Sequence, residues 1–306
     1  MSRFPPGPRA ARRAAALAFL CATLGPAPAP AAVAGSPPVR AVQPSAAPRA
    51  MLVVCSPGSP GDTLLAQPVM DGFASAVARA AGWATGRLGA IYFETEASGL
   101  ARLASSDAAL ALVPLPFYLK HAAELDLEPR LQIATSAGPT ETWSLAARRG
   151  VVKSPEALAG WELIGSPGYA PAFVRGPVLG AWGPLPATAR ITFGAAVLTP
   201  LRRSASGEKI AVILDDAQSA ALPSLPFAPD LEIVARSRPL PAALLCTVGR
   251  RLEQGGIAKL VAALLAMPAR AGDAEMLSSI RVARFVRCDL PALTAARRAF
   301  AAASGG

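Results

Sequence analysis

The chain has 306 residues, of which 52% are hydrophobic and 16% charged, with a formal net charge of +10. This composition supports a well-buried core, leaves room for two ordinary domains and excludes a disordered chain. The basic residues are spread along the sequence, without a Lys/Arg-rich run or interleaved aromatic residues, so we expect no nucleic-acid partner.

The N-terminus predicts export. Four arginines (Arg3, Arg9, Arg12 and Arg13) precede an apolar stretch at 14–24 and an A-x-A site that ends at Ala34. This order is typical of a secretory signal peptide, so we expect cleavage of residues 1–34, a periplasmic mature chain of charge +6 and a flexible leader at 35–50. The alternative is a retained membrane anchor, but the apolar stretch is too short to cross a bilayer.

Apolar strand-like runs alternate with helical patterns along the rest of the chain, which predicts an α/β fold with parallel sheets. Two polar breaks, SAGPTET at 136–142 and RSRPLP at 236–241, interrupt this alternation. We expect them to be hinge crossovers between two lobes. The first lobe then comprises 51–135 plus 242–303, including a last helix at 290–302, and the second lobe comprises 143–235.

The sequence Ser-Pro-Gly follows a strand-like run twice. Ser56-Pro57-Gly58 comes after the run at 51–55, and Ser166-Pro167-Gly168 comes after the run at 161–164. Each tripeptide alone is an ordinary turn composition. Strand, glycine-rich turn and helix together present backbone N–H groups at the carboxyl edge of a sheet. We call each Ser-Pro-Gly turn with the residues directly after it a corner, the first beginning at Ser56 and the second at Ser166. Two corners indicate two α/β lobes that face a shared ligand cleft.

We expect the ligand to lie where strand ends and helix starts converge. Serine and glycine supply donors and a close backbone approach, the tyrosines suit an apolar or planar ligand, and Asp215 either accepts from an amine or hydroxyl or caps a helix. The predicted ligand-binding residues are Ser56, Gly58, Ser59, Tyr118 (with its neighbour Phe117), Thr140, Glu141, Thr142, Ser166, Gly168, Tyr169, Asp215 and Gln218.

Catalytic and metal-binding patterns are absent from the sequence. The single histidine, His121, lies beside Lys120 in a helical stretch and is expected on the surface. No G-x-S-x-G, H-E-x-x-H, paired C-x-x-C or P-loop occurs, so we predict no enzyme, no cofactor and no metal site.

Three cysteines remain after the predicted cleavage. They are Cys55, Cys246 and Cys288. Because an exported chain enters an oxidising compartment, we favour one disulfide between Cys246 and Cys288, which both lie in the C-terminal part. Buried unpaired thiols are the alternative.

Four segments in order carry a resemblance to a known family. They are LARLASSDAALALVPLPFYL (100–119), TWSLAARRGVVKSPEALAGWELIGSPG (142–168), EKIAVILDDAQ to RSRPLP (208–241) and LVAALLAMPARAGDAEMLSSIRVARF (260–285). Together they resemble the phosphate/phosphite/phosphonate-binding type 2 periplasmic solute-binding proteins, over roughly Met51 to Arg298. The resemblance implies two lobes, each a mostly parallel sheet flanked by helices and joined by two crossovers. It also implies a monomer that closes on a small polar or anionic ligand and delivers it to an ABC permease.

The chain departs from this family after the second glycine-rich turn. Tyr169-Ala170-Pro171-Ala172 stands where phosphonate-binding members have a hydroxyl-rich cluster, and proline also lacks an N–H donor. Each charge-assisted hydrogen bond lost is worth ~1.5–3 kcal/mol, which argues against tight phosphonate binding. Two other functions stay open: an orphan sensory or accessory subunit that works with a membrane sensor, and an enzyme on the same scaffold.

Overall fold

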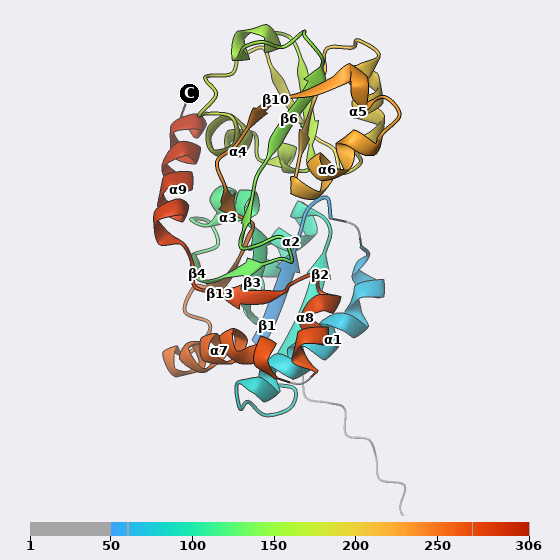
Figure 1. Ribbon diagram of the computed structural model, residues 1–306. Helices are drawn as coiled ribbons and strands as arrows, with labels where there is room; N and C mark the ends of the chain where they lie inside the picture. Colours follow the sequence, from blue (N-terminus) through green and yellow to red (C-terminus); the bar gives the residue numbers. More distant parts are fainter. Residues whose placement is uncertain (1–49, 60, 271, 306) are drawn as a thin grey trace, which may run out of the picture. The chain divides into compact units, whose positions relative to one another are not determined.

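The computed structural model describes residues 50–59, 61–270 and 272–305 (Figure 1). The predicted signal peptide and nearly all of the predicted leader lie outside these residues. Ala50 is described, and it begins the first strand rather than ending the leader.

The described strands form two large sheets and one small one. The six-stranded sheet has the order β13-β4-β12-β3-β1-β2, the five-stranded sheet has the order β10-β6-β9-β7-β8, and β11 pairs with β5. The strands are β1 (Ala50–Cys55), β2 (Leu88–Phe93), β3 (Ala108–Pro114), β4 (Leu127–Ala134), β5 (Thr140–Glu141), β6 (Ser144–Arg148), β7 (Glu162–Gly165), β8 (Arg190–Phe193), β9 (Ile210–Leu214), β10 (Leu231–Arg236), β11 (Leu240–Pro241), β12 (Ala243–Val248) and β13 (Arg284–Val286).

Helices connect and cover these strands. The α-helices are α1 (Thr63–Ala80), α2 (Glu96–Leu103), α3 (Leu115–His121), α4 (Pro171–Phe173), α5 (Leu198–Ala205), α6 (Asp216–Ala221), α7 (Gln254–Ala266), α8 (Asp273–Ser279) and α9 (Leu290–Ser304). Single-turn helices of other types are η1 (Pro155–Leu158), η2 (Ser166–Tyr169), η3 (Val174–Val178), η4 (Leu222–Ser224), η5 (Ala228–Asp230) and η6 (Met267–Ala269).

Both large sheets are mixed rather than mostly parallel. β1 pairs in parallel with β2 and β3, but β12 runs antiparallel to β3 and β4. In the second sheet β7 pairs in parallel with β8 and β9, while β6 runs antiparallel to β9 and β10. The reason is the path of the chain. β6 and β12 each enter their sheet directly from a crossover. Each therefore starts at the sheet edge where its neighbours β9 and β3 end, and runs in the opposite direction.

The two predicted crossovers lie side by side. Glu141 of β5 pairs with Leu240 of β11. Beyond this small sheet the Trp143 N–H donates to the Ser237 hydroxyl at 2.9 Å, and the Ser237 N–H donates to the Trp143 carbonyl at 2.8 Å. Paired backbone therefore joins the two connections between the large sheets.

One hydrophobic cluster contains buried residues of both large sheets. Val53 and Phe117 from the side of the six-stranded sheet share it with Leu145 and Phe173 from the side of the five-stranded sheet. Separate clusters cover the remaining face of each sheet. Because the first cluster crosses between the sheets, the described residues form a single compact unit.

The sequence analysis expected the last helix to rejoin the first lobe, whereas in the structure this helix packs on the segments that follow the second corner. α9 packs on α4 and η3, so closely that a Cβ atom on Gly176 would lie 2.2 Å from the Ala299 carbonyl oxygen. Figure 1 shows α9 beside α4 and α3, and the Arg297 guanidinium lies 5.1 Å from the centre of the Tyr118 ring of α3. Helical periodicity identified α9 correctly but carried no information about the surface it covers.

The segment after the second corner is also less regular than expected. Instead of one helix up to Ala181, the chain forms η2, the three-residue α4 and the π-helical η3. Pro167, Pro171 and Pro177 each lack the N–H that continues an α-helical ladder, which explains the interruptions.

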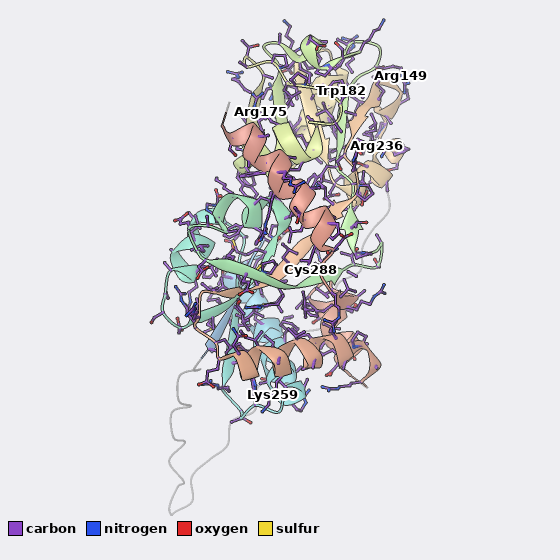
Figure 2. All side chains as sticks on the ribbon, turned by 90° about the vertical axis from the view of Figure 1, so that its left-hand side faces the viewer. Arg149, Arg175, Trp182, Arg236, Lys259 and Cys288 are labelled. Atoms are coloured by element: carbon purple, nitrogen blue, oxygen red, sulfur yellow. The ribbon has the colours of Figure 1, made fainter. Side chains whose placement is uncertain are left out.

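The predicted disulfide is not formed, and Cys55, Cys246 and Cys288 are free thiols. Cys246 lies in β12, whereas Cys288 follows β13, and β4 separates these two strands in the sheet. Burial raises the pKa of both thiols above the usual range, which keeps them protonated and therefore unreactive toward oxidation. Figure 2 shows Cys288 where the chain enters α9, and Arg175 near the other end of that helix.

Among the described helices, none by itself has the length and apolarity needed to cross a membrane. Two consecutive helical segments, 254–269 and 273–279, meet this criterion only when taken together, and they are bent by 99°.

Candidate functional site

A cavity of about 570 Å³ lies between the two large sheets and the paired crossovers. Its lining comes from segments far apart in the sequence: the first corner with α1, the ends of β2 and β3, β5, the second corner, the residue after β9 and the loop before β13. Six of the predicted ligand-binding residues line it: Ser56, Ser59, Glu141, Ser166, Tyr169 and Asp215.

The first corner is a tight turn stabilised by its own residues. Gly58 has a φ of +82°, in the left-handed region that favours glycine. The hydroxyl oxygens of Ser56 and Ser59 lie 2.7 Å apart. The helix that follows is already capped, because the Asp62 carboxylate accepts from the N–H groups of Leu64 and Leu65. A carboxylate therefore occupies the end of α1 that would otherwise attract an anion.

The second corner is packed into its own sheet. A Cβ atom on Gly165 would lie 2.6 Å from the Ile213 carbonyl oxygen, and one on Gly168 would lie 2.0 Å from the Thr192 carbonyl oxygen. Glycine is required at both positions because backbone occupies the space of a side chain. This packing fixes Ser166 and Tyr169 on the wall of the cavity.

The two corners touch each other. A Cβ atom on Gly58 would lie 3.1 Å from Ser166 Cβ and 3.2 Å from Phe193 Cε2. Further along, Lys120 Nζ donates to the Tyr169 carbonyl at 2.6 Å and lies 5.7 Å from the centre of the Tyr169 ring. Residues that follow strands of the six-stranded sheet thus contact the second corner next to the cavity.

His121 is buried, contrary to the expected surface position. It is 6% exposed, and its Nε2 lies 2.7 Å from Glu96 Oε1, which also binds Lys120 Nζ at 2.8 Å. Its Nδ1 lies 3.3 Å from Glu124 Oε2. The carboxylates of Glu96 and Glu124 supply the hydrogen-bond partners that a buried imidazole needs. A helical pattern alone does not show that these partners will be present. His121 does not line the cavity.

Carboxyl groups gather where the first crossover meets α6. Burial, with further contributions from Asp215 and Asp216, raises the pKa of Glu141 to about 8. Burial also raises the pKa of Asp215 above its usual range. Asp215 caps α6 by accepting from the Gln218 N–H at 2.7 Å, and Asp216 accepts from the Thr142 N–H at 2.9 Å.

The other predicted ligand-binding residues have structural roles and do not line the cavity. Gly58 shapes the first corner and Gly168 packs against Thr192. Thr140 pairs with Pro241, Thr142 donates its N–H to Asp216, and the Gln218 side chain accepts from the Asp215 N–H. Tyr118 and Phe117 are fully buried in the core. The sequence analysis placed these residues after strands or in the first crossover, but the direction of each side chain is set by the fold.

Several residues of the lining were missed. Trp143 directly follows the crossover residues, and its position next to Thr142 was the available signal. Tyr92 sits near the end of β2, where a strand end was already predicted. Arg281 lies in a turn with a φ of +59°, and no sequence pattern pointed to it.

Within residues 50–59, 61–270 and 272–305, no group of three or more His, Cys, Asp or Glu side chains is arranged to hold a metal ion.

Comparison with known proteins finds similarity in structure but not in sequence. No protein-family model matches the chain, and no curated protein sequence matches it. XAC2383 from Xanthomonas citri, solved with a bound chloride ion, has a TM-score of 0.65 at 15% identity, covering 83% of this chain and 99% of its own.

Two further solved structures are similar over most of their length. A binding protein component of an ABC phosphonate transporter from Pseudomonas aeruginosa has a TM-score of 0.56 at 15% identity, covering 84% of this chain and 87% of its own. PhnD1 from Prochlorococcus marinus, in complex with methylphosphonate, has a TM-score of 0.53 at 12% identity, covering 79% of this chain and 94% of its own. The predicted fold class is thereby confirmed: the chain has an α/β two-lobe periplasmic-binding fold.

Proposed function

We propose that this protein is an extracytoplasmic solute-binding protein that captures a small polar molecule between its two lobes. The observation that carries the proposal is the cavity of about 570 Å³, lined by both Ser-Pro-Gly corners and by the paired crossovers. A cavity of this size suits a small organic solute. Solved structures of the same fold include a component of an ABC phosphonate transporter, which supports uptake through an ABC permease as the purpose of capture.

Capture would occur by closure of the lobes about the crossovers. We assign the first lobe to β1–β4, β12 and β13 with their helices, and the second lobe to β6–β10 together with α9, because α9 packs on α4 and η3. The short β5–β11 pair would then be the hinge. Export through cleavage of residues 1–34 and a periplasmic location belong to the same proposal.

The solute is proposed to be held by binding rather than converted. Ser56, Ser59 and Ser166 offer hydroxyl groups, and Glu141 and Asp215 offer carboxyl groups, on a lining that also includes Tyr92 and other aromatic rings. The single histidine is engaged with Glu96 and Glu124 and does not line the cavity, so no imidazole base is available to a bound molecule.

A thermal-shift panel on the purified chain that starts at Gly35 tests the proposal. Inorganic phosphate, methylphosphonate, ethanesulfonate, 4-aminobutyrate and putrescine are each added at increasing concentration. Binding of any one of them to the folded state raises the melting temperature with the logarithm of its concentration. If none changes the melting temperature, solute capture loses its support, and the sensory or accessory role with a degenerate cleft takes its place.

A further inference from the structure

The cavity continues from the corners into the space between the six-stranded sheet and its covering helices. Figure 1 shows α1 and α8 side by side next to β2, and both helices contribute to the lining. The residues of this part belong to the hydrophobic cluster of that sheet face or pack against it. We call it the apolar branch, and it is lined by Val54, Leu112 and Ile133 from the sheet and by Ala66, Val69 and Met70 from α1.

The branch begins where the packed core under α1 stops. Side chains alternate along a strand, so Leu52 and Val54 lie on one face of β1, and Leu131 and Ile133 lie on the same face of β4. Leu52 and Leu131 are buried, whereas Val54 and Ile133, each nearer the end of its strand, are partly exposed and line the cavity. Because protein interiors are close-packed, apolar side chains beside a cavity lack the contacts that an apolar ligand can supply.

The polar groups that border the branch are already engaged within the chain. The Tyr92 hydroxyl donates to the Ser59 carbonyl at 3.3 Å, and the Ser279 hydroxyl donates to the Met276 carbonyl at 2.6 Å. Arg281 also lines the cavity, but it is an exposed residue whose charge can stay in water. Among the described residues, the branch therefore offers a bound molecule mainly apolar surface.

The corners at the other end of the cavity offer hydroxyl groups. Ser56 and Ser59 form one hydrogen bond between their hydroxyl oxygens, which uses only one of the two O–H donors, and Ser166 adds a third hydroxyl. The cavity volume of about 570 Å³ lies within the range of about 300–1,000 Å³ that is typical of ligand pockets. A single bound molecule therefore has room for a polar group at the corners and a carbon chain in the branch.

We propose that the captured solute is amphipathic, with a polar group that binds at the two corners and a hydrocarbon group of several carbons that fills the apolar branch. This inference rests on the proposed function of solute capture and names the chemical class of the solute. Binding removes apolar surface of the solute and of the branch from water, which is favourable in proportion to the area buried. The branch belongs to the first lobe alone, so the hydrocarbon group docks there first, and lobe closure then brings Ser166 to the polar group.

Calorimetric titration with pairs of probes that differ only in chain length tests the proposal. The pairs are methylphosphonate with pentylphosphonate, ethanesulfonate with hexanesulfonate, and ethylamine with hexylamine. Burial of each added methylene strengthens binding by up to about fourfold, so the longer member of at least one pair should bind about 10- to 200-fold more tightly. Its binding enthalpy should also fall more steeply with temperature, because burial of apolar surface gives a negative heat-capacity change.

Three variants locate the effect. Ala66→Leu fills the branch from α1, and Ala243→Leu fills it from β12, where Ala243 lies on the same strand face as the core residue Leu245. Each should weaken binding of the longer probe about tenfold or more and leave the shorter probe within about twofold. Ala262→Leu makes the same chemical change at an exposed position of α7 and should alter neither affinity. The melting temperature of each variant shows that it is folded.

The failures can be told apart. If short probes bind and the longer chains add no affinity, the hydrocarbon group is overturned while solute capture stands. A preference for the longer probe that is unchanged in both Ala66→Leu and Ala243→Leu overturns the assignment to the apolar branch. If no member of any pair binds, both the amphipathic solute and solute capture are overturned.

Discussion

The same three residues, Ser-Pro-Gly, build the two corners of the cavity in different ways. In the first corner Gly58 takes a left-handed conformation and the chain continues through Gly61 and Asp62 before α1 begins. In the second corner Ser166–Tyr169 is itself a 3₁₀ turn, and Gly168 is needed for contact with the next strand. The residues that follow each tripeptide, and the backbone beside it, decide which conformation forms.

The corners also differ in charge. The first is followed by Asp62, whose carboxylate is consumed in capping α1. The second lies on a cavity wall shared with Glu141 and Asp215, where carboxyl groups face open space. Both copies of the repeated sequence pattern contribute residues to the lining of one cavity, but the two walls have different chemistry.

The largest expected effect is at the second corner. Gly168→Ala places a Cβ atom 2.0 Å from the Thr192 carbonyl oxygen, and neither backbone segment can move without disturbing β8. We expect the free energy of unfolding to fall by roughly 4 kcal/mol or more, measured by urea denaturation. A loss below about 1 kcal/mol would show that this corner is not held by backbone packing.

The next effect concerns the charge of the second wall. The pKa of Glu141 is raised from 4.5 to about 8 by burial and by Asp215 and Asp216. Between these two pH values the folded chain keeps a proton on Glu141 that the unfolded chain has lost. The contribution of this group to the free energy of unfolding is therefore fully present below about pH 4.5 and is lost as the pH rises through about 8. Glu141→Gln should remove this loss and stabilise the unliganded chain at about pH 9 by roughly 2–4 kcal/mol.

Thermal or urea unfolding at several pH values measures this effect. Glu253→Gln is the control, because its side chain is exposed. Identical pH profiles for the unmodified chain and Glu141→Gln would contradict the raised pKa of this carboxyl group.

A smaller effect is expected at the first corner. Gly58→Ala forces a Cβ atom onto a residue with φ of +82° and brings it 3.1 Å from Ser166 Cβ. Left-handed strain costs roughly 1–2 kcal/mol, and the flexible serine opposite can adjust. Urea denaturation of Gly58→Ala and Gly168→Ala side by side therefore compares the corners directly. Equal losses of unfolding free energy would mean that the backbone conformation of the glycine, and not its close packing, sets the cost of the substitution at both corners.

The smallest effect concerns two buried tyrosines. The hydroxyl groups of Tyr118 and Tyr169 both lack a partner among the described residues, but only Tyr169 belongs to the cavity lining. Removing an unpaired buried hydroxyl should be neutral or stabilising by less than about 1 kcal/mol in Tyr118→Phe and Tyr169→Phe alike. Urea denaturation of both variants measures this effect. A loss of unfolding free energy above about 1 kcal/mol in either variant would show that its hydroxyl group has a partner.

The sequence by itself indicated most of the strands and the position of the corners. Runs such as 88–93 and 231–235 become β2 and β10 nearly residue for residue, because short apolar runs bounded by turn residues have few other ways to be buried. The break at 136–142 contains β5. Glu141 was nominated because it lies in this break, and Asp215 because a polar residue at a strand end lies at the edge of a sheet.

Only the tertiary structure decided which of these residues reach the cavity. Gln218 and Thr142 are engaged by Asp215 and Asp216, and a local sequence pattern does not distinguish a capping residue from a free one. The surface covered by α9, the burial of His121 and the antiparallel entry of β12 all depend on residues distant in sequence. Periodicity reports that a face is buried, whereas the partner of that face is fixed only when the whole chain has packed.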